Sequence, residues 1–168
     1  RLAPLPAPQP VGEREWVDCW YPEEDVVIWH GPEFRCLRQI AVDGDHGWGK
    51  LVAPSRTGNL GGHRAGDAWQ LPAALLDSAF FACGVYLWFR FEGVVAIPAG
   101  IDAIRLGRQA RPGENCIVHI SYRGRDGEQG IFDFAITGED GATILQLEGY
   151  RNIIVSQTPA SELQRQAT

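Results

Sequence analysis

Residues 70–89 form a run of about twenty residues that is almost entirely apolar and contains one charged side chain, that of Asp77. A helix without a polar face does not lie on a protein surface, so this segment predicts a helix enclosed by other elements. An ionised carboxylate in such surroundings loses several kcal/mol of hydration free energy. We therefore expect Asp77 to be neutral, paired or functional, with a helix-start carboxylate held by backbone amides as the structural alternative.

The same run approaches the length that crosses a bilayer. Pro72, Asp77, Ser78 and Gly84 interrupt it, and no segment rich in Lys or Arg flanks it to set an orientation. We therefore predict a buried core helix and no contact with a membrane. Proline suits the first turn of a helix, so the helix is predicted to begin within a few residues of Pro72 and to end near Trp88.

Composition narrows the function classes. The chain has 168 residues, of which 45% are hydrophobic, and this is enough to build the core of one domain. Its net charge of −6 opposes binding to nucleic acid. No phosphate loop and no dinucleotide fingerprint is present, so no nucleotide cofactor is expected.

The four cysteines predict the redox state of the chain. Cys19, Cys36, Cys83 and Cys116 have neither CxxC nor CxxH spacing, and each has apolar neighbours. This pattern is typical of reduced, buried thiols in a cytoplasmic protein and does not favour a metal site.

The ends of the chain differ in composition from its middle. Residues 1–10 contain a proline at every second or third position, which predicts a stiff, extended linker and argues against a signal peptide. We expect residues 1–25 to be a linker and lead-in, 26–156 to be the folded domain, and 157–168 to be a tail. A linker at the first residue suggests that the chain was cut from a longer protein.

The rest of the chain alternates as strands do, with turn signals between the runs. Asp126-Gly127 and Asp140-Gly141 are strong hairpin signals. Side chains of alternating polarity assign one buried face to these strands, and the strands after the helix predict a meander. The predicted strands are 26–29, 36–42 and 48–53 before the helix, and 94–97, 101–106, 116–122, 131–137, 143–147 and 153–155 after it.

An apolar helix followed by an antiparallel meander predicts an α+β domain in which a strongly curved antiparallel sheet wraps the helix. That arrangement is the hotdog fold. It places the helix at the centre of the core, where its apolar side chains need to be.

Two motifs carry a resemblance to a known family. The string His30-Gly-Pro-Glu-Phe34 resembles the YGPxF motif, and Leu71-Pro-Ala-Ala-Leu-Leu-Asp77 resembles the HPALLDxxxQ motif, of the dehydratase domains of modular and iterative polyketide synthases. Their order and spacing are similar to those of the second, C-terminal, of the two hotdog halves in that family. The Gly149-Tyr-Arg151 segment looks closest to iterative synthases that make enediyne or polyunsaturated chains.

The resemblance implies a reaction. Dehydratases of this family are lyases that eliminate water from a 3-hydroxyacyl chain on the phosphopantetheine of an acyl carrier protein, and they leave a 2-enoyl thioester. A histidine of the first half removes the α proton, and an aspartate of the second half handles the leaving hydroxyl. Asp77 matches that aspartate. No cofactor is implied, and the implied partners are the carrier protein, the first hotdog half of the same multidomain synthase, or a second copy of this chain.

The resemblance also implies which residues contact the acyl chain. They are His30, Gly31, Pro32, Phe34, Phe80 and Phe81, with Trp29, around a narrow apolar tunnel that Asp77 faces. A carboxyl in such a tunnel has a raised pKa and can donate a proton to a poor leaving group. The alternative for His30 is a turn residue that orients the bend.

Departures from the motifs leave the function open. None of the four histidines begins an HxxxGxxxxP motif, so the general base of the family is missing. Phe81 stands where a Gln or His usually holds the aspartate, while His30 and Leu71 replace a Tyr and a His. Either the chain is half of an active dehydratase and is inactive alone, or it is a non-catalytic hotdog that binds or shapes the growing polyketide. A hotdog thioesterase is the weaker third reading. The acyl chain length and its stereochemistry do not follow from the sequence.

Overall fold

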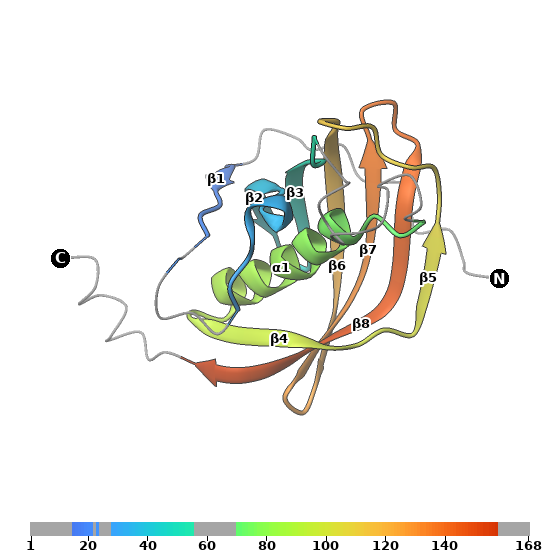
Figure 1. Ribbon diagram of the computed structural model, residues 1–168. Coiled ribbons are helices and arrows are strands. Elements are labelled where there is room, and N and C mark those ends of the chain that lie inside the picture. The colour runs from blue at the N-terminus through green and yellow to red at the C-terminus, as the bar shows by residue number, and fades with distance from the viewer. Residues whose placement is uncertain (1–14, 22, 24–27, 56–69, 158–168) are drawn as a thin grey trace.

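A computed structural model describes residues 15–21, 23, 28–55 and 70–157 (Figure 1). The linker 1–10, His63 and residues 158–168 of the predicted tail lie outside the described residues. The elements, in chain order, are β1 (Val17–Asp18), the 3-10 helix η1 (Pro32–Phe34), β2 (Leu37–Asp43), β3 (His46–Val52), α1 (Ala73–Arg90), β4 (Val94–Gly100), β5 (Ala103–Leu106), β6 (Asn115–Asp126), β7 (Gln129–Gly138) and β8 (Thr143–Gln157).

One curved antiparallel sheet wraps the helix. The order of its strands is β1-β2-β3-β6-β7-β8-β4, and β5 also pairs with β8. Figure 1 shows α1 lying across the concave side of this sheet. The hotdog architecture predicted from the apolar helix and the alternating strands is thereby confirmed.

The path of the chain differs from a simple meander. Of the strands after the helix, only β6, β7 and β8 follow one another as neighbours, because α1 carries the chain from β3 to the opposite edge of the sheet, where β4 pairs with β8. β6 then returns to pair with β3. The meander predicted for all the strands after the helix is therefore wrong for β4 and β5.

The last strand is longer than predicted. The predicted strands 143–147 and 153–155 belong to one continuous strand, β8. Gly149 lies inside it with a φ of 65°, a backbone conformation that glycine adopts at low cost, and the pairing of β7 with β8 shifts register next to it. This bend lets one strand pair with β7, β5 and β4.

The sheet also begins earlier than the predicted domain start at residue 26, because β1 pairs with β2. In the predicted strand 26–29, residues 26 and 27 lie outside the described part of the chain. Ile28 and Trp29 are not in a strand, since the backbone there already leads into the Gly31-Pro32 turn.

The helix lies where the sequence places it. α1 starts directly after Pro72 and ends at Arg90. It is long and apolar enough to cross a membrane by length and composition, but half of that window is buried inside the domain. Its buried side chains are Ala74, Leu75, Leu76, Ser78, Ala79, Ala82, Cys83, Tyr86 and Leu87. The prediction of a core helix is confirmed.

The core forms between this helix and the concave face of the sheet. On β7, Phe132, Phe134 and Ile136 are fully buried, whereas the residues between them are only half-buried, as their alternation predicts. All four cysteines are free thiols. Burial raises the pKa of Cys83, so this thiol stays protonated.

Candidate functional site

Asp77 and His30 lie next to each other although 47 positions separate them in the sequence. The distance from His30 Nε2 to Asp77 Oδ2 is 3.6 Å. The His30 side chain is 9% exposed and that of Asp77 is 38% exposed. The imidazole is therefore enclosed, and the carboxyl is the part of the pair that solvent or a ligand reaches.

Ser78 joins the two segments that carry this pair. Its hydroxyl donates a hydrogen bond to the carbonyl of Phe34 at 2.8 Å and accepts one from the backbone N–H of Cys36 at 3.2 Å. Ser78 is fully buried. It fixes the end of η1 against the second turn of α1, and so it sets where His30 lies relative to Asp77.

The turn before β2 follows from its sequence. Pro32 occupies the start of η1, and the Phe34 N–H donates to the carbonyl of Gly31 at 2.9 Å. Arg35 Nε donates to the carbonyl of His30 at 2.9 Å. Phe34 packs against the core, whereas Trp29 is 60% exposed. The turn therefore anchors His30 through its backbone on one side and through Phe34 on the other.

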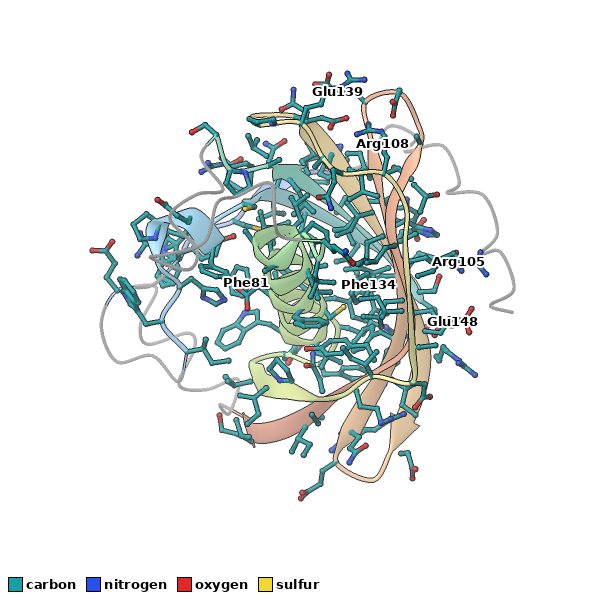
Figure 2. All side chains as sticks on the ribbon, turned by 45° about the vertical axis from the view of Figure 1, so that its right-hand side comes forward. Phe81, Arg105, Arg108, Phe134, Glu139 and Glu148 are labelled. Atoms are coloured by element: carbon teal, nitrogen blue, oxygen red, sulfur yellow. The ribbon has the colours of Figure 1, made fainter. Side chains whose placement is uncertain are left out.

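Aromatic rings enclose the His30 imidazole. Phe81 lies against it with ring centroids 4.8 Å apart, and Tyr21 meets it edge-on at 5.4 Å. Tyr21 and Phe81 stack on each other at 4.8 Å. In Figure 2, Phe81 and Phe134 lie on opposite sides of α1. The three rings and the Asp77 carboxyl thus form one cluster between α1 and the segment that leads into η1.

Burial raises the pKa of the Asp77 carboxyl, and the neighbouring His30 acts weakly in the opposite direction. Burial also lowers the pKa of His30, with Arg35 acting in the same direction and Asp77 against it. Both shifts favour the neutral form of each group. A neutral carboxyl beside an apolar surface can donate a proton, as a general acid must.

Asp77 lies too far along α1 for the partial positive charge of the helix N-terminus to lower its pKa. Asp77 is the fifth residue of the helix, beyond its first turn, where the partial charge of the N-terminus has fallen off. Within the described part of the chain, no backbone amide donates to its carboxyl. The alternative of a helix-start carboxylate held by backbone amides does not describe this residue.

The predicted site residues divide between two sides of the helix. His30 and Phe81 gather beside Asp77, and Gly31, Pro32 and Phe34 form the turn that positions His30. Phe80 lies on the sheet side, where it stacks on Tyr150 at 4.4 Å and meets Phe134 edge-on at 6.0 Å. The acyl tunnel that these residues are expected to line stays a prediction.

No motif in the sequence marks Tyr21 or Arg35 as a site residue, and Ser78 stands out there only as an interruption of the apolar run. Tyr21 lies in the predicted lead-in, so nothing in its neighbourhood marks it as a site residue. Asp77 contributes to the raised pKa of the Tyr150 hydroxyl, behind burial and Cys83. Among the residues that the structure describes, no group of His, Cys, Asp and Glu could hold a metal ion.

A helix enclosed by one curved antiparallel sheet, with a half-buried acid beside an enclosed histidine, defines a hotdog domain with a candidate acid–base site. The family described as polyketide synthase dehydratase N-terminal domain matches residues 5–162. The chain therefore belongs to the polyketide synthase dehydratase family. The family description names the N-terminal domain, whereas the motifs at His30 and Asp77 resemble those of the second half; the match shows a hotdog half of a dehydratase, and its assignment to the second half rests on the motifs.

Solved structures share this fold. The bifunctional dehydratase-cyclase domain of ambruticin biosynthesis matches with a TM-score of 0.65 and 20% identity, over 88% of this chain and 50% of that chain. The dehydratase domain of RzxB from Pseudomonas fluorescens matches with a TM-score of 0.60 and 21% identity, over 74% and 42%. The PaaI protein of E. coli matches with a TM-score of 0.53 and 16% identity, over 71% and 81%.

The chain thus spans about half the length of these dehydratase domains. No curated protein matches its sequence.

Proposed function

We propose that this chain is the aspartate-bearing hotdog half of a polyketide synthase dehydratase and that it acts on 3-hydroxyacyl chains carried by an acyl carrier protein. The observation that carries the proposal is the Asp77 carboxyl, which lies in an apolar helix, has a raised pKa and remains 38% exposed beside His30. Membership of the dehydratase family supports the same reading.

In the proposed reaction, a base supplied by the other hotdog half removes the α proton of the thioester. The bond between the β carbon and its hydroxyl breaks as the double bond forms, and Asp77 gives its proton to the leaving hydroxyl, which departs as water. A raised carboxyl pKa suits this step, because the proton must be present near neutral pH before it is donated. No cofactor takes part in this scheme, and the substrate is carried on phosphopantetheine.

The partner half would cover apolar side chains of α1 that the described residues leave accessible. Trp88 and Phe89 are exposed, and Phe81 and Val85 are only partly buried. Apolar side chains of this kind favour association. We expect the isolated chain either to associate with itself or to present this surface to the first half in the parent synthase, and light scattering on the isolated chain tests this. A strictly monomeric chain would contradict self-association.

A non-catalytic hotdog that binds or shapes the polyketide is the second candidate, and Phe81 favours it, because a phenylalanine cannot hold the Asp77 carboxyl by a hydrogen bond. We further infer a cytoplasmic location from the four reduced thiols. The iterative type, with an enediyne or polyunsaturated product of the kind found in antibiotic biosynthesis, is the finer part of the proposal and rests on the Gly149-Tyr-Arg151 ending alone. The acyl-transferring domains of such a synthase would load and extend the chain, and a reduction of its 3-oxo group would supply the 3-hydroxyacyl substrate.

One experiment separates these functions. The parent synthase protein that contains this half, and the isolated chain, are each incubated with a 3-hydroxyacyl carrier-protein thioester, and the carrier protein is analysed by mass spectrometry. Loss of water by the parent, with none by the isolated chain, is the expected result. Release of the free acid would indicate a thioesterase instead. An unchanged thioester that stays bound to the parent would favour the binding module and contradict the dehydratase.

A further inference from the structure

We propose that His30 is a positioning residue for Asp77: it replaces, from a different segment of the chain, the hydrogen-bond donor that the helix itself lacks at Phe81. The inference rests on the proposed function, because it concerns the residue that holds the acid of that reaction. It assigns His30 a role at the carboxyl and not in contact with the acyl chain.

Burial distinguishes this role from that of a general base. The imidazole is 9% exposed, whereas the carboxyl in front of it is 38% exposed. A group that removes a proton from a substrate carbon must reach that carbon, and the enclosed imidazole does not present itself to a ligand as the carboxyl does. His30 therefore acts through Asp77.

The cluster around His30 fixes the direction of its ring. Phe81 and Tyr21 contact the imidazole on two sides, and Arg35 holds the backbone carbonyl of the same residue. With its ring and backbone both held, His30 keeps Nε2 toward the carboxyl. Little side-chain freedom remains to be lost when the pair tightens around a substrate.

Phe81 is one departure from the family motifs, and it packs against another, His30. It lies one turn after Asp77 on the same helix face, where a donor would reach the carboxyl directly. Here that position holds an apolar ring, and the ring packs against the imidazole at 4.8 Å. The hydrogen-bond donor is thus provided by His30, in the turn before β2, and Phe81 packs against that histidine.

The pair can also share a proton. At 3.6 Å the two atoms are beyond hydrogen-bond distance, so the pair closes by roughly 0.5 Å before a neutral imidazole donates from Nε2 to the ionised carboxylate or a protonated carboxyl donates to the same nitrogen. After Asp77 has given its proton to a leaving hydroxyl, the Nε2–H donor stabilises the carboxylate that remains. The other titratable or charged groups that face this pair are Arg35, Tyr21, Cys36 and Tyr150.

Activity of the parent dehydratase tests the inference with three variants. His30→Phe keeps an aromatic ring but removes the donor, and we expect kcat to fall on the order of tenfold to a hundredfold with little change in KM. His30→Gln keeps a donor and should stay within a few-fold of the wild type. The double variant His30→Phe with Phe81→His returns the donor to the helix and should regain most of the rate. His46→Phe, at the start of β3, is the control that leaves the rate unchanged.

The outcomes separate this inference from the function it rests on. An active parent in which His30→Phe is as fast as the wild type overturns the inference alone, as does a His30→Gln variant as slow as His30→Phe. A parent with no dehydration activity overturns the proposed function and the inference together.

A second readout needs no substrate. In the 168-residue chain, the His30 imidazole is titrated by NMR, with Asp77→Asn and the control Asp102→Asn. Because the Asp77 carboxylate raises the pKa of His30, its removal should move the titration to lower pH, whereas Asp102→Asn should leave it in place. An identical His30 titration in wild type and Asp77→Asn would overturn the pairing.

Discussion

Replacement of Ser78 by alanine should destabilise the domain, because the Ser78 hydroxyl makes two hydrogen bonds to the backbone of a distant segment. The hydroxyl donates to the Phe34 carbonyl at 2.8 Å and accepts from the Cys36 N–H at 3.2 Å. Ser78→Ala removes both bonds and leaves two backbone groups beneath the helix without these partners. At about 1 kcal/mol for each bond, the loss in the free energy of unfolding is ~2 kcal/mol.

Urea denaturation of the 168-residue chain measures this loss, provided that the m-value does not change. Ser121→Ala is the matched control, because Ser121 is half-buried and the hydrogen bond between its hydroxyl and His46 Nδ1 is long and weak at 3.5 Å. We expect the control to stay within about 0.5 kcal/mol of the wild type. A Ser78→Ala variant as stable as that control would refute the claim that Ser78 fastens the His30 turn to the helix.

Three further predictions concern stability. A Cβ at Gly49 would lie 2.7 Å from two core side chains, so Gly49→Ala should lower the free energy of unfolding in urea by roughly 1–3 kcal/mol. In α1, a Cβ at Gly84 would meet nothing closer than 3.9 Å, so Gly84→Ala should raise the free energy of unfolding by up to about 1 kcal/mol. Glu114→Gln removes the charge of a buried carboxylate that pairs with the half-buried Arg108, and it should lower the melting temperature more than Asp102→Asn, which breaks an exposed pair. The folded-state pKa of Asp77 lies above its ordinary value, so its favourable contribution is present at low pH and is lost as the pH rises through that pKa. Asp77→Asn should therefore gain melting temperature relative to the wild type between pH 4 and pH 7, and a constant difference would contradict this.

The central helix and the wrapped sheet could be predicted because their patterns are local. An apolar run with one carboxylate has to be enclosed, and the alternation on β7 identifies Phe132 and Phe134 as core residues without any tertiary information. The position of Asp77 on that helix follows from the same run.

The path of β4 could not be predicted in this way. Whether the strand after a helix pairs with the strand before it, or crosses to the other edge, depends on which edge the finished sheet leaves free. The predicted strands 143–147 and 153–155 are one strand, because Gly149, with its φ of 65°, bends β8 without ending it.

The pair of His30 and Asp77 depends on contacts between distant segments. The hydrogen bonds of Ser78 join positions 42 and 44 residues apart, and Tyr21 approaches from a segment that composition assigns to a linker. The motifs identified both residues. Their separation of 3.6 Å follows only from the packed structure.

The rate of dehydration by the parent synthase protein after Asp77→Asn tests the central claim most directly. A 3-hydroxyacyl carrier-protein thioester is the substrate, and Asp102→Asn is the control, since its carboxylate pairs with Arg151 at the surface. The account predicts that Asp77→Asn lowers kcat on the order of a hundredfold or more, as the loss of a general acid does, while Asp102→Asn leaves it unchanged. Unchanged turnover in the Asp77→Asn variant would contradict the catalytic assignment and leave the binding module as the function of this hotdog.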